Sequence, residues 1–248
     1  MSKRHSPGLL ALRVAVAALT LGMLSAVHAQ QEADDSIQYK LTFGHYAAST
    51  GNDGRDINLR GTRGSQVAWI GYYNERAGLQ QWRTGVDQRF DTSFVRTVLS
   101  AQWASGGALV GSVTSEVGGP WFAIVGFGRT NVRPYVNLNF DPNDAITFGI
   151  GTRTRSGLEA TVFQVRDDRL GTGQRVTHAV LRQRLGEASR LTLDLFTKSG
   201  RIDTGEQIRA KSVTITYDHD PFFIRFAHDP YAGFGSAKQN RLSGGFRF

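Results

Sequence analysis

Asn240-Arg241-Leu242-Ser243-Gly244-Gly245-Phe246-Arg247-Phe248 is the stretch that decides the fold, because its apolar and polar residues alternate to the last position. Counting back by twos from Phe248 gives Phe246, Gly244 and Leu242. A period of two predicts a β-strand with one apolar face. Chain termini fray unless they are held, so a final strand with exposed aromatic residues needs a neighbour. We therefore predict that it closes a barrel by pairing with the first strand, with its apolar face toward lipid.

This ending resembles the C-terminal strand of Gram-negative outer-membrane β-barrel proteins, which end in Phe. The resemblance implies that Leu242, Phe246 and Phe248 form a membrane-assembly signal that the barrel-assembly machinery recognises. It also implies that the chain lies in the cell outer membrane, with outer-membrane lipid and lipopolysaccharide as partners.

The composition narrows the class of protein. The chain has 248 residues, 29 Gly, 6 Pro and no Cys, which suits one barrel of many strands and excludes disulfides and thiolate chemistry. Its mean hydropathy of −0.29 argues against membrane helices but not against a barrel, where polar lumen residues dilute the apolar ones. The net charge is +8, and the basic residues are scattered singly without a nucleic-acid-binding motif, so no nucleic-acid partner is expected.

The N-terminus has the pattern of an export signal. Lys3 and Arg4 precede an apolar run over 8–26, and Val27-His28-Ala29 stands before Gln30. Small residues three and one positions before the bond predict cleavage between Ala29 and Gln30. The alternative is a retained anchor helix, although no basic stop-transfer flank follows the run. The predicted organisation is a cleaved signal helix over 1–29 and an outer-membrane β-barrel over 30–248.

Alternating segments fill the rest of the chain. We predict an all-β fold, a transmembrane antiparallel up-and-down barrel of about 14 strands, with 12 as the alternative. The region 47–64 is rich in Gly and Asp and is predicted to be the longest loop, and the phase change near Phe163 suggests a bulge. The predicted segments are 37–44, 67–73, 82–89, 95–103, 109–117, 121–127, 135–140, 146–153, 158–165, 177–185, 191–198, 212–217, 222–226 and 240–248.

Whether the number of strands is even or odd determines which connections are expected on each side of the membrane. If both ends of the barrel are periplasmic, the strand count is even and the longest loops, including 47–64, 168–173, 199–206 and 229–236, lie outside. The turns at 76–78 and 106–107 are then periplasmic. Aromatic residues near strand ends would form girdles at the membrane interfaces: Tyr39, Tyr73, Trp82, Trp103, Trp121 and Tyr217. The alternative is a secreted β-sandwich or lipocalin-like barrel with the apolar face inside.

The opposite face of the strands would line the lumen and is mainly basic. A positive wall favours anions over cations, which indicates a passive porin-like channel that leans toward anions and passes small solutes. In the alternative, the arginines pair with the acids in ladders, and the barrel conducts little. The predicted pore-lining residues are Lys40, Arg83, Asp87, Arg89, Arg96, Glu116, Arg153, Arg182, Arg184, Asp194, Lys198, Arg225 and Arg241.

Two further readings remain. The short polar N-terminus and the Asp141-Pro142-Asn143-Asp144 turn resemble the YaiO-like outer-membrane barrels, a resemblance that implies a non-conducting structural or surface barrel. An outer-membrane hydrolase acting on lipid or peptide would need a Ser or acid beside a His at the outer rim, where His45 and His228 are expected. No serine motif accompanies them, so we expect no catalytic residues, and the sequence predicts no metal site and no cofactor.

Overall fold

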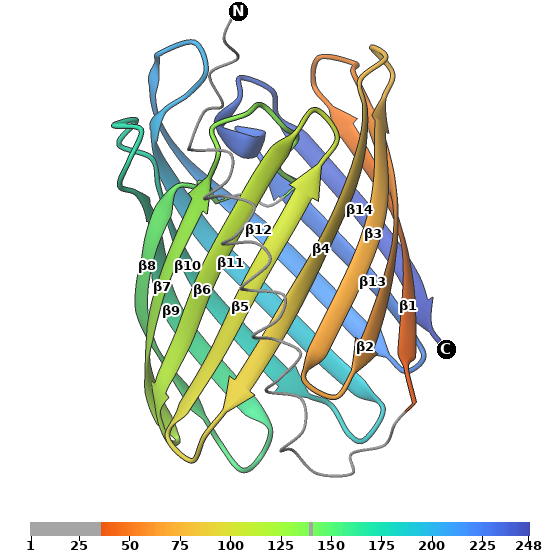
Figure 1. The fold of residues 1–248 in the computed structure, drawn as a ribbon, viewed down its shortest axis with the longest axis vertical. Coiled ribbons are helices and arrows are strands. Elements are labelled where there is room, and N and C mark those ends of the chain that lie inside the picture. The colour runs from red at the N-terminus through yellow and green to blue at the C-terminus, as the bar shows by residue number, and fades with distance from the viewer. Residues whose placement is uncertain (1–35, 139–140) are drawn as a thin grey trace, which may run out of the picture. The chain divides into compact units, whose positions relative to one another are not determined.

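A computed structural model describes residues 36–138 and 141–248, so the predicted signal helix and the Ala29–Gln30 cleavage site lie outside the described residues. The described residues form fourteen antiparallel strands that close into a barrel, which confirms the predicted fold and strand number (Figure 1). The strands are β1 (Gln38–Ala48), β2 (Gly54–Arg63), β3 (Gln66–Glu75), β4 (Gln80–Asp91), β5 (Val95–Ala104), β6 (Ala108–Gly118), β7 (Trp121–Thr130), β8 (Ala145–Arg153), β9 (Leu158–Asp167), β10 (Arg175–Arg184), β11 (Ser189–Arg201), β12 (Gln207–His219), β13 (Phe222–Asp229) and β14 (Gln239–Arg247).

The first and last strands close the barrel. β1 pairs with β14 from Lys40 opposite Arg247 to Ala48 opposite Gln239. Beyond the last strand residue, Tyr39 and Phe248 exchange two backbone hydrogen bonds of 2.9 and 3.0 Å. Their rings stack with centroids 5.6 Å apart. The final aromatic residue therefore lies on the seam between the two strands.

The outer wall of the barrel is apolar. Trp121, Ile150 and Phe222 have 71%, 62% and 61% of their surface exposed, and similar side chains occupy the outward positions of the other strands. A closed barrel satisfies all backbone hydrogen bonds between strands, so such a wall can face hydrocarbon. The apolar face lies outside, and the secreted-barrel alternative is therefore wrong. Among the described residues, no helix is long and apolar enough to cross a membrane.

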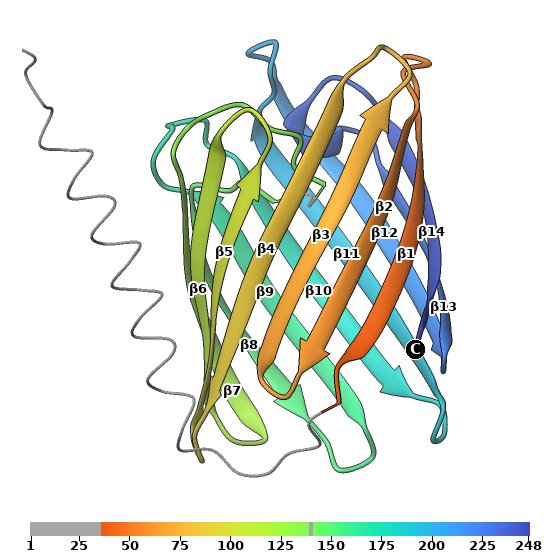
Figure 2. The same ribbon diagram turned by 45° about the vertical axis from the view of Figure 1, so that its right-hand side comes forward.

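The two ends of the barrel differ in the length of their connections (Figures 1 and 2). At one end of the barrel, β1 begins and β14 ends, and the other strands are joined there by the short turns 64–65, 92–94, 119–120, 154–157, 185–188 and 220–221. The other end has the connections 49–53, 76–79, 105–107, 131–144, 168–174, 202–206 and 230–238. In outer-membrane barrels the short turns are periplasmic and the long loops are extracellular. The turns at 76–79 and 105–107 belong to the outer end, so their predicted periplasmic position was wrong.

The strand assignment from the sequence contained two errors, one strand missed and one added, which together left the predicted number of strands unchanged. The predicted loop 47–64 contains β2, whose outward Ile57 and Leu59 alternate with inward Asp56 and Asn58. Of the predicted strand 135–140, the described residues 135–138 are not in a strand and belong to the connection between β7 and β8. Gly and Asp hid the alternation of β2, whereas a short alternating run imitated a strand in the connection. The strands between these two errors therefore run in the direction opposite to the predicted one.

Two assignments of faces also change. The pairing of β9 with β8 and with β10 is continuous, so the bulge predicted near Phe163 is absent from this described strand. Phe163 points inward and stacks on the His178 ring at 4.7 Å. Tyr73, predicted in an interface girdle, also points inward and is only 2% exposed. It packs edge-on against Tyr46 at 5.5 Å, whereas the other predicted girdle residues are exposed on the outer wall.

Candidate functional site

The lumen is the candidate functional site. Strand alternation places the predicted pore-lining residues at inward-facing positions: Lys40, Arg83, Asp87, Arg89, Arg96, Glu116, Arg153, Arg182, Arg184, Asp194, Lys198, Arg225 and Arg241. Sequence reasoning missed the inward Asp56 and Arg60 because β2 was assigned to a loop. The alternation of Ile57 and Leu59 with polar residues was the signal that could have found them.

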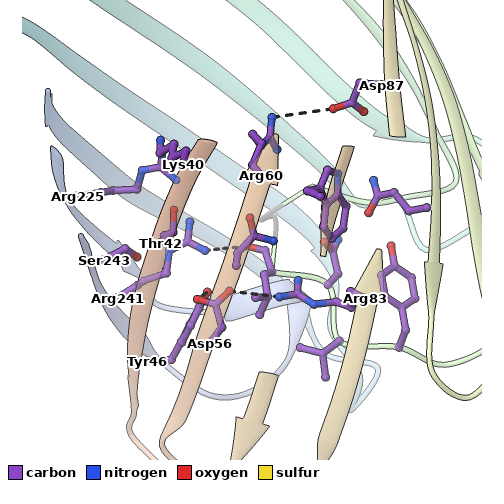
Figure 3. A pocket seen from close by; sticks show the side chains of 17 residues that line it. Lys40, Thr42, Tyr46, Asp56, Arg60, Arg83, Asp87, Arg225, Arg241 and Ser243 are labelled. Carbon is purple, nitrogen blue, oxygen red and sulfur yellow. Dashed lines mark hydrogen bonds and ion pairs between the residues drawn. The ribbon is translucent and has the colours of Figure 1, made fainter. Parts of the chain in front are cut away.

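A cavity of about 430 Å³ lies on one side of the lumen (Figure 3). Four of its five basic residues come from neighbouring strands: Arg60 from β2, Lys40 from β1, Arg241 from β14 and Arg225 from β13. The fifth, Arg83, lies on β4. The residues that line the cavity are Lys40, Thr42, Tyr46, Asp56, Asn58, Arg60, Trp69, Arg83, Asp87, Gln102, Tyr135, Val136, Asn137, Leu138, Arg225, Arg241 and Ser243.

Strand register gathers these cations around small side chains. Lys40 stands opposite Arg60, and Arg225 stands opposite Ser243. Gly245 is the partner of Thr42 across the seam. Small groups between the long basic side chains leave the space that the cavity occupies. The result is a concave basic wall centred on the seam between β1 and β14.

The charges of this wall are unevenly compensated. Arg83 lies 3.3 Å from the Asp56 carboxylate, and the Arg60 to Asp87 contact is 4.0 Å. Lys40 Nζ lies 3.7 Å from the centre of the Phe223 ring. Arg225 Nε donates a hydrogen bond to Thr216 Oγ1 at 3.1 Å. Within the described part of the chain, no carboxylate forms an ion pair with Lys40 or Arg225, so the wall keeps a positive excess.

The connection 131–144 contributes to the other side of the cavity. The backbone N–H of Val136 donates to Gln81 Oε1 at 3.1 Å, and the Arg241 guanidinium donates to the Leu138 carbonyl oxygen at 2.9 Å. Gln81 lies on β4 and Arg241 on β14, so the connection is held from two strands of the wall. Burial raises the pKa of the Tyr135 phenol in this connection, which therefore stays neutral. The connection narrows the lumen beside the basic wall.

A buried histidine holds the C-terminal part of the same connection. His178 is 5% exposed, and its ring lies between the rings of Phe163 and Phe196. Its Nε2 lies 2.9 Å from Asp141 Oδ1, and its Nδ1 lies 3.0 Å from the Asp194 carboxylate. Asp194, predicted to line a pore, therefore serves in the wall as one of two carboxylates that bracket an imidazole.

An ion-pair ladder runs along the wall toward the periplasmic end. Arg153 contacts Glu116 at 2.5 Å and Glu159 at 2.8 Å. The ladder continues from Glu159 to Arg182 at 2.6 Å and from Glu116 to Arg96 at 3.5 Å. The predicted alternative of arginine–acid ladders therefore describes this level of the lumen. The basic wall and the ladder are separate features of one interior.

Lys198 does not present its charge to the open lumen. Its Nζ lies 2.5 Å from Asp229 Oδ2, and both side chains are fully buried. They sit beside an apolar cluster formed by Val176, Phe196, Ile202, Ile208 and Phe234. The 3-10 helix in the connection 230–238 supplies Phe234. This sector of the outer end is packed, and the pore-lining prediction for Lys198 is wrong in this respect.

The histidines considered for catalysis lie away from the lumen. His45 and His228 occupy outward positions, and His228 Nδ1 contacts Asn240 Oδ1 at 2.7 Å. His219 contacts Ser189 Oγ at 2.8 Å near the periplasmic turn, and its neighbour Asp218 pairs with Arg247 at 2.5 Å. In residues 36–138 and 141–248, no group of three His, Asp or Glu side chains is arranged to hold a metal ion.

No protein-family model and no curated protein matches the chain. Among solved structures, the outer membrane protein Omp33 of Acinetobacter baumannii is similar at 8% identity and a TM-score of 0.54, over 87% of this chain and 100% of that chain. The outer membrane protein OprD of Pseudomonas aeruginosa gives 9% identity, 86% and 93% coverage and a TM-score of 0.46. The NanC porin is similar at 10% identity and a TM-score of 0.44, over 83% of this chain and 98% of that chain. The likeness to Omp33 concerns the fold, and with its apolar outer wall this chain is an outer-membrane β-barrel.

Proposed function

We propose that this barrel is a passive, porin-like channel that favours small anions. The observation that carries the proposal is the basic wall of Lys40, Arg60, Arg225 and Arg241 on the cavity beside the connection 131–144. Charge of one sign along a narrow, low-dielectric passage raises the local concentration of the opposite ion. The cations at the narrow level would therefore select for anions.

The location of the uncompensated charge supports this function. The ladder through Glu116, Arg153 and Glu159 alternates in sign, so it contributes little net field to a passing ion. Lys40 and Arg225 lack a carboxylate partner among the described residues and stand beside the cavity. Selectivity would then arise at the narrow level and not at the periplasmic mouth.

The second candidate is a non-conducting structural barrel. It is favoured by the ladder and by the apolar packing of Phe196, Phe234 and the buried Lys198–Asp229 pair, which fill part of the lumen. Such a barrel would fold and insert equally well and would pass no current. An outer-membrane hydrolase is the least supported reading, because His45 and His228 face outward.

The test is single-channel recording of the chain from Gln30 onward, refolded into a planar bilayer with a salt gradient. We expect discrete conductance steps and a reversal potential that reports anion selectivity. The double variant K40Q/R225Q should reduce the anion-to-cation permeability ratio several-fold. The control R55Q/R63Q removes two charges from the outer wall and should leave the ratio unchanged. A correctly folded barrel that carries no current would reject the channel and favour the structural candidate.

A further inference from the structure

The outer wall of the barrel carries charge of one sign. In the described strands, the outward-facing positions hold several Arg and Lys residues but no Asp or Glu. Most of these cations gather near the outer ends of four neighbouring strands, β9 to β12. They are Arg166, Arg175, Arg201, Arg209 and Lys211, and each is exposed. No acidic side chain on the same face of the described strands supplies a counter-ion for these five cations.

Strand register aligns three of these arginines in a row. Arg166 on β9 stands directly opposite Arg175 on β10. Arg175 stands opposite Ser199 on β11, and its Nε donates to Ser199 Oγ at 2.9 Å. Ser199 in turn stands opposite Arg209 on β12. With strands roughly 4.8 Å apart, the row spans about 14 Å along the wall.

The row is unfavourable in the absence of an anion. Like charges placed directly opposite on neighbouring strands repel each other, as Arg166 and Arg175 do here. The acids next in sequence are engaged elsewhere: Asp167 points inward and accepts hydrogen bonds from Thr172, and Asp168 forms a bidentate pair with Arg129 at 2.7 Å. No carboxylate among residues 36–138 and 141–248 forms an ion pair with the row.

The position of the row identifies the class of anion. Val162, Leu181 and Leu195 lie on the same outward face toward the membrane interior and are 52%, 45% and 51% exposed. The row thus marks the boundary between hydrocarbon and head groups in the outer leaflet. Guanidinium groups bind phosphate through short, charge-assisted hydrogen bonds. A single phosphate reaches one or two of these arginines, whereas the full row requires phosphates that are separated along one molecule.

We propose that Arg166, Arg175 and Arg209 form a binding site for an outer-leaflet lipid that carries at least two phosphate groups. The lipid's acyl chains lie on the apolar wall below, and its phosphates neutralise the row. Arg201 and Lys211, near the two sides of the row, add to the same field. The site is on the outside of the barrel and does not depend on whether the lumen conducts.

Native mass spectrometry of the folded barrel in a zwitterionic detergent tests the site, with diphosphoryl lipid A, its monophosphoryl form and phosphatidylcholine as probes. We expect diphosphoryl lipid A to bind at least tenfold more tightly than the monophosphoryl form, and phosphatidylcholine to bind only weakly. R166Q/R175Q should weaken diphosphoryl lipid A binding by at least tenfold, a change that corresponds to about 1.4 kcal/mol. The matched control R55Q/R63Q should change it less than twofold.

Several outcomes would overturn the proposal. Equal weakening by R166Q/R175Q and R55Q/R63Q would show general charge attraction. Full competition by millimolar inorganic phosphate would show a simple anion site and not a lipid site. Gel mobility before and after heating verifies that each variant is folded. If R166Q/R175Q does not fold, the single variants R175Q and R209Q apply the same test, because both side chains are exposed.

Discussion

The imidazole Nε2 of His178 lies 2.9 Å from Oδ1 of Asp141, and this contact joins the barrel wall to the connection that narrows the lumen. His178 lies on β10, whereas Asp141 lies in the connection between β7 and β8. The other ring nitrogen of His178 faces Asp194. The imidazole therefore bridges a fixed carboxylate of the wall and a carboxylate of the connection.

Asp141→Ala should loosen the connection 131–144. The variant removes the carboxylate that accepts from His178, a bond to a charged group that contributes about 1.5–3 kcal/mol. If the barrel conducts, single-channel records should show more open-state noise and a larger mean conductance. Asp203→Ala removes an exposed acid from another outer connection and serves as the control. Identical records for both variants would show that the His178 contact does not restrain the connection.

Arg153→Gln should destabilise the periplasmic half of the barrel. The variant removes the cation between Glu116 and Glu159, which then repel each other across the ladder. We expect the free energy of unfolding to fall by about 1–3 kcal/mol in urea titrations followed by tryptophan fluorescence. Arg184→Gln is the control, because no carboxylate pairs with Arg184 in the described residues, and it should cost less than about 0.5 kcal/mol. An equal loss of unfolding free energy in both variants would show that the ladder does not stabilise the barrel.

Gly245→Ala should impair closure, whereas Gly244→Ala should not. A Cβ at Gly245 would collide with the backbone carbonyl of Leu41 on β1 and with the Phe223 ring. At Gly244 the nearest atom, the Phe223 carbonyl oxygen, is 3.4 Å away. We expect Gly245→Ala to lower the free energy of unfolding by about 1–3 kcal/mol or to block folding. Heat-modifiable gel mobility reports the folded fraction of each. Similar folded fractions for the two variants would show that the close approach of Gly245 to Leu41 on β1 does not limit closure of the barrel.

Phe248→Ala should reduce insertion into the outer membrane in cells more than it reduces the stability of the refolded protein. Loss of the stacking on Tyr39 should cost about 0.5–1.5 kcal/mol in refolded protein. If Leu242, Phe246 and Phe248 form the predicted assembly signal, the amount inserted in the outer membrane should fall much further than this. Phe222→Ala is the control, because Phe222 is similarly exposed on β13 at the same end. Equal losses of insertion for both variants would argue against a terminal signal.

Asp168 should titrate at an unusually low pH. Its hydrogen bonds to the Arg129 guanidinium hold the pKa of this loop carboxyl below its ordinary value. Because the folded pKa is depressed, the stabilising contribution is fully present above about pH 4 and is lost as the pH falls through the folded pKa. Carboxyl ¹³C NMR should show this shift, and Arg129→Gln should return the midpoint toward 3.9. An unchanged midpoint in Arg129→Gln would contradict this cause.

The sequence by itself determined the architecture, because a period of two is a local property. The alternation from Leu242 to Phe248 and in most other segments predicted an all-β barrel with a polar lumen and an apolar wall, and the fold agrees. The same local logic failed where composition was misleading. Gly54 and Asp56 hid β2, and the run 135–140 imitated a strand.

Only the tertiary structure decided what the lumen charges do. Arg153 meets two glutamates, whereas Lys40 meets an aromatic ring, and nothing in their own neighbourhoods along the chain separates these cases. The partners come from other strands through register, which closure of the whole barrel sets. The path of the connection 131–144 likewise depends on Gln81 and His178, which only the closed barrel brings within hydrogen-bonding distance. Local alternation specifies a wall, but pairing across that wall depends on the complete ring of strands.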